Sequence, residues 1–311
     1  MKKISIVIPV FRGVNVKLTE ECVASLRRNS KEHHEIIIVI NPGTDVEAYK
    51  HIDADLVVGI EDQGQCHANN FGVSKAKNEW VMIADNDNVF PADWEKALDH
   101  LKPDLVLTLN WMENNPRGVA PGVIFCDCGG IDNFDREKYE VEAKKASREE
   151  FMPGFGYPFI FEKKHYEVVG GFDIAYDPLG NTCDSDFRYR LMLYGLDMQR
   201  YFGVVCYHFC QMIAWTFYDD AKCDYHLKGN RRIFETKFNA AQAPSPQIWY
   251  SEFFIDETKL RFKADWIGKI SRRWIGSEDL NKYFECSECR YHFFVTREKC
   301  PRCGHPRPES K

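Results

Sequence analysis

The chain has 311 residues, 44% of them hydrophobic, and its 41 Lys and Arg against 47 Asp and Glu give a formal net charge of −6 at pH 7. That length and apolar content suffice for one large hydrophobic core with a small appendage. The net negative charge excludes a general polyanion-binding surface, so any phosphate group must be held locally, by a metal ion or a few cationic side chains.

Membrane and export signals are not evident in the sequence. No apolar stretch approaches the roughly 20 residues that span a bilayer. The N-terminus MKKISIVIPVF begins with basic residues, but its apolar run is short and Pro9 interrupts it, which predicts a first strand and not a signal peptide. Most of the 12 cysteines are then expected to be reduced thiols. We expect a cytoplasmic protein, with peripheral attachment to a membrane left open.

The first third of the chain alternates between two kinds of segment. Short apolar runs rich in β-branched residues predict strands, and segments with apolar residues at helical spacing predict helices. The predicted strands are 4–11, 35–40, 55–60, 80–85 and 104–109, and the predicted helices are 16–29, 65–77 and 91–101. This alternation predicts an α/β fold with a largely parallel central sheet and right-handed crossovers.

The rest of the chain is more irregular. Further helices are predicted at 136–150, 163–169 and 184–194, and further strands at 159–162 and 204–209. We expect three parts: a main domain over 1–239, a linker with an amphipathic helical segment over 240–280, and a small domain over 281–311.

An acidic pair follows the buried run Val81 to Ala84, in the sequence Asp85-Asn86-Asp87. Two carboxylates one residue apart repel each other and lose hydration when buried, so they suit a core poorly. At the carboxyl end of a strand they suit a hard divalent cation, and ligands of such sheets bind at that edge. A polar turn is the alternative reading, because Asp and Asn are common in turns.

Six segments in order resemble the family 2 glycosyltransferases, which have the nucleotide-sugar-binding GT-A fold. No single motif is specific, but their common order and spacing are. The matching segments are ISIVIPVF at 4–11, EIIIVINPGTD at 35–45, the Gly64, Ala68, Asn70 and Gly72 pattern, IADND at 83–87, GGFD at 170–173 with the acid-rich start at 183–187, and YHF at 207–209.

The resemblance implies an inverting, metal-dependent transfer of a sugar from a nucleotide-sugar donor to an acceptor hydroxyl. It implies Mn²⁺ or Mg²⁺ held by Asp85, Asp87 and His208, and Asp184 as the catalytic base. The acceptor stays open between a glycan, a lipid-linked glycan, a protein and a nucleic-acid base. The residues implied to contact the donor are Pro9, Phe11, Asn41, Gly64, Asn70, Asp85 and Asn86.

Two positions depart from the family pattern. Asn41 stands where the family usually has an aspartate that reads the nucleotide base, and Cys183-Asp184 replaces the usual Glu-Asp pair. Asp184 has a structural alternative as a helix N-cap, and His208 as a histidine satisfied by hydrogen bonds alone. We expect Arg190 to pair with the neighbouring carboxylates.

Aromatic residues near the predicted site allow two readings. They could form a platform for a sugar or an acceptor, or pack in the core. These residues are Trp111, Phe155, Tyr157 and Phe159.

The C-terminal segment has cysteines at the spacing of a zinc ribbon. Two Cys-x-x-Cys pairs, separated by ten residues, indicate one structural Zn²⁺ with four thiolate ligands. The predicted ligands are Cys286, Cys289, Cys300 and Cys303. The segment 258–275 could form a basic, Trp-bearing helix, and this helix and the ribbon could contact a membrane or a nucleic acid.

A second functional class competes with the enzyme. The chain could be a nucleic-acid- or protein-binding module on a non-catalytic GT-A-like fold. The intact acidic residues Asp85, Asp87 and Asp184 favour the enzyme, and the net acidity disfavours a nucleic-acid module.

Overall fold

The structure is a computed structural model that describes residues 2–11, 13–62, 64–114, 123–177, 180, 182–210, 230 and 234, and the backbone of 283–285 and 292–294. The side chains of residues 192 and 193 are not described.

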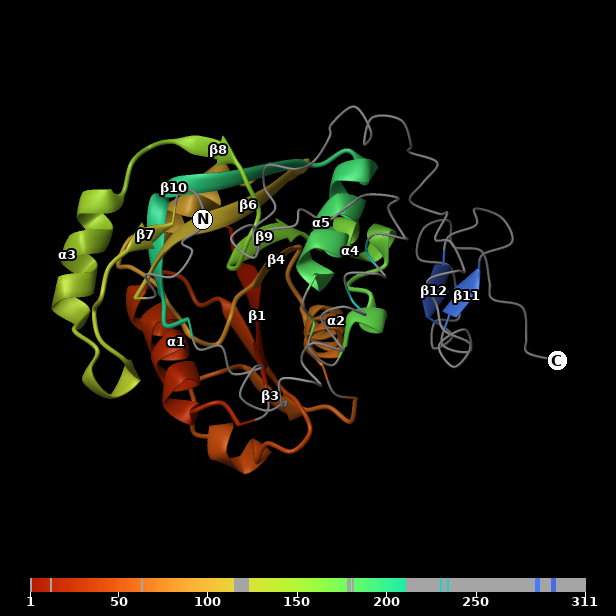
Figure 1. The fold of residues 1–311 in the computed structure, drawn as a ribbon, viewed down its shortest axis with the longest axis horizontal. Coiled ribbons are helices and arrows are strands. Elements are labelled where there is room, and N and C mark those ends of the chain that lie inside the picture. The colour runs from red at the N-terminus through yellow and green to blue at the C-terminus, as the bar shows by residue number, and fades with distance from the viewer. Residues whose placement is uncertain are drawn as a thin grey trace.

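A ten-stranded sheet forms the centre of the fold (Figure 1). Its strands are β1 Ile4–Val10, β2 Glu35–Ile40, β3 Leu56–Gly59, β4 Trp80–Ile83, β5 Asn88–Val89, β6 Leu105–Glu113, β7 Ile124–Phe125, β8 Phe151–Pro153, β9 Phe159–Glu162 and β10 Asp197–His208. The order across the sheet is β3-β2-β1-β4-β9-β6-β10-β5, with β7 paired to β6 and β8 paired to β10.

The sheet is mixed, so the expectation of a largely parallel sheet is confirmed only in part. Strands β1 to β4 pair in parallel, and so do β6 and β10. Strand β9 is antiparallel to both of its neighbours, β4 and β6, and β5 and β8 are antiparallel to β10. The run Phe159 to Phe161 of β9 is apolar and buried, and such a short run does not reveal the direction of its strand.

Helices cover both faces of the sheet (Figure 1). The α-helices are α1 Val16–Asn29, α2 Gln65–Lys75, α3 Arg136–Ala146, α4 Lys163–Val169 and α5 Cys183–Tyr194, and the 3₁₀ helices are η1 Val46–Tyr49, η2 Trp94–His100, η3 Ile131–Asn133 and η4 Ile174–Tyr176. Helices α1 and α3 pack on one face, and α2, α4 and α5 pack on the other. The predicted helix at 91–101 is instead the shorter 3₁₀ helix η2. The predicted helices at 16–29 and 163–169 are confirmed.

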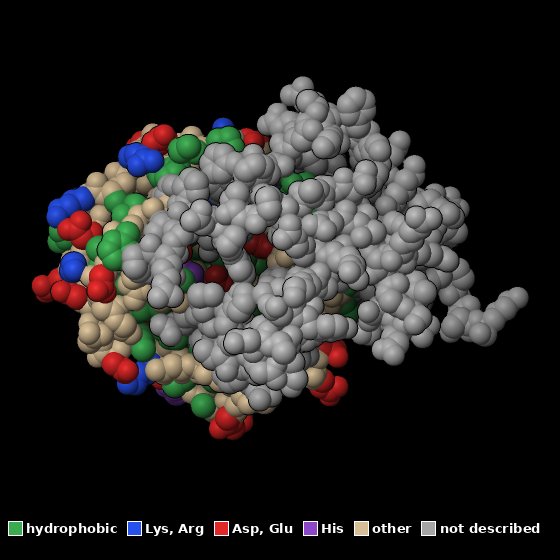
Figure 2. Space-filling model, viewed as in Figure 1, with side chains coloured by type: hydrophobic (Ala, Val, Ile, Leu, Met, Phe, Trp, Pro, Cys, Tyr) green, Lys and Arg blue, Asp and Glu red, His purple; other side chains and the backbone are tan. Residues whose placement is uncertain are grey.

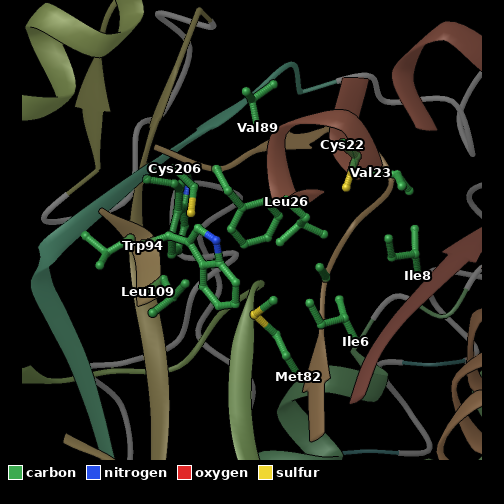
Figure 3. Packing of buried hydrophobic residues seen from close by; sticks show 14 of the residues in the cluster. Ile6, Ile8, Cys22, Val23, Leu26, Met82, Val89, Trp94, Leu109 and Cys206 are labelled. Atoms are coloured by element: carbon green, nitrogen blue, oxygen red, sulfur yellow. The ribbon is translucent and has the colours of Figure 1, made fainter. Parts of the chain in front are cut away.

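The hydrophobic core lies in two layers, one on each face of the sheet. Along β1, Ile6 and Ile8 face the layer under α1, whereas Val7 faces the layer under α2, as the alternation of a strand requires. Figure 3 shows the first layer, in which Trp94 lies near Leu109 and Met82. Each such large side chain contributes about 1.5–3 kcal/mol by burial. Both faces of the central strands are therefore covered by apolar side chains.

Most of the C-terminal tail lies outside the described residues. Its two described strands, β11 Tyr283–Glu285 and β12 His292–Phe294, form an antiparallel pair that brackets residues 286–291. The four predicted zinc ligands and the segment 258–275 are outside the described residues. None of the described helices is long and apolar enough to cross a membrane.

Candidate active site

The Asp85–Asp87 segment forms a tight turn between β4 and β5. The N–H of Asp85 donates to the Asn88 side-chain oxygen at 3.0 Å, and the N–H of Asn88 donates to the Asp85 carbonyl oxygen at 3.2 Å. The turn leaves Asp87 buried and Asp85 half-buried. Both carboxylates therefore stay at the end of β4.

A short strand brings His208 to this turn. In the antiparallel pairing of β5 with β10, His208 lies opposite Asn88, one residue beyond Asp87. The N–H of Phe209 also donates to the Asp87 carbonyl oxygen at 3.1 Å. As a result, Nε2 of His208 lies 3.3 Å from Oδ1 of Asp87. The sequence pattern did not predict β5, which is only two residues long.

The predicted metal ligands come together. One ligand atom from each of Asp85, Asp87 and His208 lies within 4.8 Å of the others. Carboxylate oxygens with one imidazole nitrogen are donors that Mn²⁺ and Mg²⁺ accept. A second group, Glu113, His208 and Cys210, meets the same distance criterion and shares the histidine. Figure 2 shows acidic side chains and a histidine near the middle of the face in view.

Asp87 changes the pKa values of both Asp85 and His208. Burial and the nearby Asp87 carboxylate raise the pKa of Asp85 to about 7, with a smaller contribution from Asp184. Burial opposes a charge on His208, yet the Asp87 and Glu113 carboxylates raise its pKa well above the usual value. A divalent cation would relieve the repulsion between Asp85 and Asp87, so the donor set fits such an ion.

The predicted base Asp184 lies in the first turn of α5, which begins at Cys183. It is thus inside the helix and is not its N-cap, although one of its oxygens accepts the N–H of Ser185 at 2.8 Å. Burial raises the pKa of Asp184. The Asp184 carboxylate also contributes to the raised pKa of Asp85.

The neighbours of Asp184 on α5 are structural. Cys183 is buried and hydrogen-bonded to the thiol of Cys66, and burial raises its pKa to about 11, so a neutral thiol replaces the expected acid. Arg190 pairs with Asp186, as predicted, and its guanidinium also donates to the carbonyl oxygens of Val169 and Gly171 at 2.6 Å each.

Asn41 and Gly64 are joined to each other rather than left free. The Asn41 amide donates to the Val10 carbonyl oxygen at 3.0 Å and accepts the N–H of Gly64 at 2.7 Å. The buried amide therefore ties the end of β1 to the start of α2. Gly64 itself has φ of +141°, and a Cβ there would lie 2.0 Å from Cγ of Asp177.

The other predicted donor-site residues occupy varied positions. Asn70 holds the loop after α4, where its amide bonds both the N–H and the carbonyl oxygen of Phe172 at 2.8 Å. Asn86 donates to the Thr19 hydroxyl at 3.2 Å. Pro9 is buried inside β1, and Phe11 packs against the core just after that strand.

Three of the four aromatic residues pack in the core, and Tyr157 is more exposed than they are. Trp111, Phe155 and Phe159 are buried in the core layers, which supports the packing reading for them. Tyr157 is half-buried, and its buried hydroxyl oxygen has no hydrogen-bond partner among the described residues.

Two polar residues, Glu113 and Asp177, were not predicted from the sequence. Glu113, the last residue of β6, contacts His208, and Asp177 accepts the N–H groups of Cys66 and His67 at the start of α2, at 3.0 Å each. Neither belongs to a motif, and each acts on residues more than 90 positions away. The only signal in the sequence was that Glu113 follows the predicted strand 104–109.

The comparisons with known proteins decide the family. The family model described as glycosyl transferase family 2 matches residues 5–162. The chain belongs to glycosyl transferase family 2. It is therefore a glycosyltransferase. The match contains Asp85 and Asp87, whereas Asp184 and His208 lie beyond it. A search among curated proteins gave no match.

Several solved structures are similar to this chain in fold. One is the mannosyltransferase PcManGT from Pyrobaculum calidifontis in complex with GDP-Man and Mn²⁺, with TM-score 0.51 and 19% identity over 85% of this chain and 71% of that one. Another is S. aureus TarS 1-349 in complex with UDP, with TM-score 0.52 and 16% identity over 92% and 72%. A third is GalNAc-T7 with UDP, GalNAc and Mn²⁺, with TM-score 0.54 and 14% identity over 88% of this chain but 56% of that one. They establish an α/β, GT-A-like fold.

Proposed function

We propose that this family 2 enzyme is an inverting, metal-dependent glycosyltransferase that uses a nucleotide-sugar donor. The observation that carries the proposal is that Asp85, Asp87 and His208 come together just beyond the carboxyl end of β4. The Asp184 carboxylate also contributes to the raised pKa of Asp85. The similar proteins whose structures contain GDP-Man or UDP support a nucleotide-sugar donor.

The donor end of the site would be organised by the β4–β5 turn. Asp87 and His208 would hold Mn²⁺ or Mg²⁺, and Asp85 would complete the set or face the ribose or sugar. When bound, the cation would neutralise the diphosphate as its bond to the sugar breaks. The hydrogen bonds of Asn41 fix the backbone at the end of β1 and at Gly64. This backbone would border the nucleotide.

The acceptor end would be organised by α5. The Asp184 carboxylate would take the proton of the acceptor hydroxyl while the acceptor oxygen bonds to the anomeric carbon and the bond to the diphosphate oxygen breaks. One displacement opposite the leaving group inverts the anomeric carbon. Burial favours this role, because a raised pKa brings the carboxylate nearer to the pH at which a general base is effective.

Replacing the base tests this proposal. Asp184→Asn keeps the size of the side chain but removes its basicity, so sugar transfer with Mn²⁺ should fall by about 10²-fold or more, while nucleotide binding should be kept. The measurement is radiolabelled sugar transfer or donor hydrolysis, beside a binding titration. Asp99→Asn changes an exposed aspartate on η2 and should leave both unchanged. Equal transfer by Asp184→Asn and Asp99→Asn would remove Asp184 as the base.

We also propose that the tail is a structural zinc ribbon. The cysteine spacing and the β11–β12 pairing around residues 286–291 support it. The purified chain should contain about one zinc per molecule by plasma mass spectrometry, and Cys286→Ser with Cys289→Ser should remove it. Full zinc content in that double variant would contradict the assignment.

A further inference from the structure

Glu113 has a contact that the proposed metal chemistry does not yet explain. Its Oε1 lies 3.3 Å from Nδ1 of His208, on the side of the ring opposite Asp87. The same oxygen accepts the indole N–H of Trp111 at 2.8 Å. All three side chains are largely buried, with exposed fractions of 9% for Glu113 and 17% for His208.

The backbone ladder fixes this contact. Strands β6 and β10 pair in parallel, and Glu113 lies directly across from His208. Paired residues on neighbouring strands project to the same face, as do residues two apart along one strand. Trp111, two residues before Glu113, therefore lies on that face as well, where its ring also contacts the Arg200 guanidinium at 4.3 Å. The Glu113 carboxylate is thus held by Trp111 on β6 and by His208 on β10.

The histidine ring consequently has one carboxylate at each nitrogen. Nδ1 faces Glu113, and Nε2 faces Asp87, each at 3.3 Å. A histidine that ligates a metal through one nitrogen commonly donates its other N–H to a carboxylate, which fixes the tautomer and the plane of the ring. The arrangement in this chain has that form, with Nε2 directed at the Asp85–Asp87 pair.

We propose that Glu113 is a positioning residue that fixes the His208 ring with Nε2 available to a divalent cation at Asp87. The inference rests on the proposed function, because it presumes that a cation binds at the β4–β5 turn. Trp111 supports Glu113 by holding the carboxylate oxygen that meets Nδ1. Loss of Glu113 should weaken cation binding without removing any ligand.

The direct test is Mn²⁺ binding by the full-length chain, followed by the electron paramagnetic resonance signal of free Mn²⁺. Glu113→Gln keeps the side-chain volume but removes the charge, and we expect Mn²⁺ affinity to fall by about 10-fold or more. Trp111→Phe keeps Glu113 but removes the indole N–H, and it should cause a smaller loss in the same direction. Glu35→Gln removes another buried carboxylate, one that bonds Ser5 at the amino ends of the strands, and should not change the affinity.

A spectroscopic signature separates positioning from general destabilisation. Electron spin echo modulation of bound Mn²⁺ reports an imidazole nitrogen ligand, which we expect in the wild type and not in His208→Ala. At saturating Mn²⁺, Glu113→Gln should show a weakened nitrogen modulation, although its urea unfolding without metal stays close to that of Glu35→Gln. Unchanged affinity and modulation in Glu113→Gln would overturn the inference.

The design also separates two kinds of failure. If His208→Ala and Asp87→Asn abolish Mn²⁺ binding but Glu113→Gln and Trp111→Phe do not weaken it, the metal site stands and the positioning role of Glu113 is wrong. If the wild type shows no Mn²⁺ binding that depends on Asp87, the proposed function is wrong, and the role of Glu113 is wrong with it.

Discussion

At the scale of single residues, the site is a set of acids whose charges are set by burial. Burial and the nearby Asp87 carboxylate raise the pKa of Asp85 to about 7. His208 gains a proton more readily than usual because two carboxylates face it. Both raised pKa values favour bound protons, which a cation at this site would displace.

The raised pKa of Asp184 gives the loss of transfer in Asp184→Asn a pH signature. A base must be ionised, so kcat/KM at saturating Mn²⁺ should fall as the pH drops through the pKa of this carboxyl group, which burial places above its ordinary value of about 3.9. The measurement is a pH profile of kcat/KM between about pH 4 and 8. A profile that stays flat down to pH 4 would contradict the role of Asp184.

Site residues that belong to a family motif were predicted from the sequence. Site residues that only the fold brings together were not. Asp85, Asp87, His208 and Asp184 occupy positions with a family pattern, and the structure brings the first three together. Glu113 reaches His208 only through the β6–β10 register, 95 residues along the chain. No local pattern encodes such a register, so sequence reasoning could not have found that contact.

At the scale of elements, the start of α2 is stabilised from another part of the chain. Gly64 precedes the helix and has no side chain to cap it, and Asp177 instead accepts the N–H groups of Cys66 and His67. A carboxylate at this end also complements the helix dipole. The close approach of Asp177 depends on the absence of a Cβ at Gly64.

Substitution of Gly64 tests this account of α2. Gly64→Ala should cost the strain of a positive φ, about 1–2 kcal/mol, and about 1 kcal/mol more for the displaced Asp177 cap. Gly195→Ala is a matched control, because Gly195 has φ of +104° and no atom within 4 Å of the added Cβ, so only strain is expected. Urea unfolding measures both, and in an Asp177→Ala background the two costs should converge. Equal costs in the unaltered background would contradict the capping role.

Strand direction and very short strands limited the prediction of elements. Hydrophobic patterning located most long elements to within a few residues, because burial on one or both faces is a local property. It did not give the antiparallel direction of β9, whose apolar sequence reads alike both ways. It also missed β5, although this two-residue strand fixes His208 beside Asp87.

At the scale of the whole molecule, the sheet order explains why residues so distant in sequence meet. Strands β4, β6 and β10 end near the β4–β5 turn, and β5 closes the edge by pairing with β10. The α/β class followed from composition and alternation, whereas the mixed topology required the structure. The same order places α5, with Asp184, on the face opposite α1.

The central claim is that a divalent cation at Asp87 holds a nucleoside diphosphate at this strand edge. The most direct measurement is the thermal unfolding of the full-length chain with a panel of nucleoside diphosphates, with and without Mn²⁺, in the wild type and in Asp87→Asn. We predict that at least one nucleotide raises Tm only when Mn²⁺ is present, by an amount equivalent to about 2.7 kcal/mol at a hundredfold excess over its Kd, and that Asp87→Asn loses this effect. Stabilisation that is independent of Mn²⁺ and unchanged in Asp87→Asn, or no stabilisation by any nucleotide of the panel, would contradict the claim.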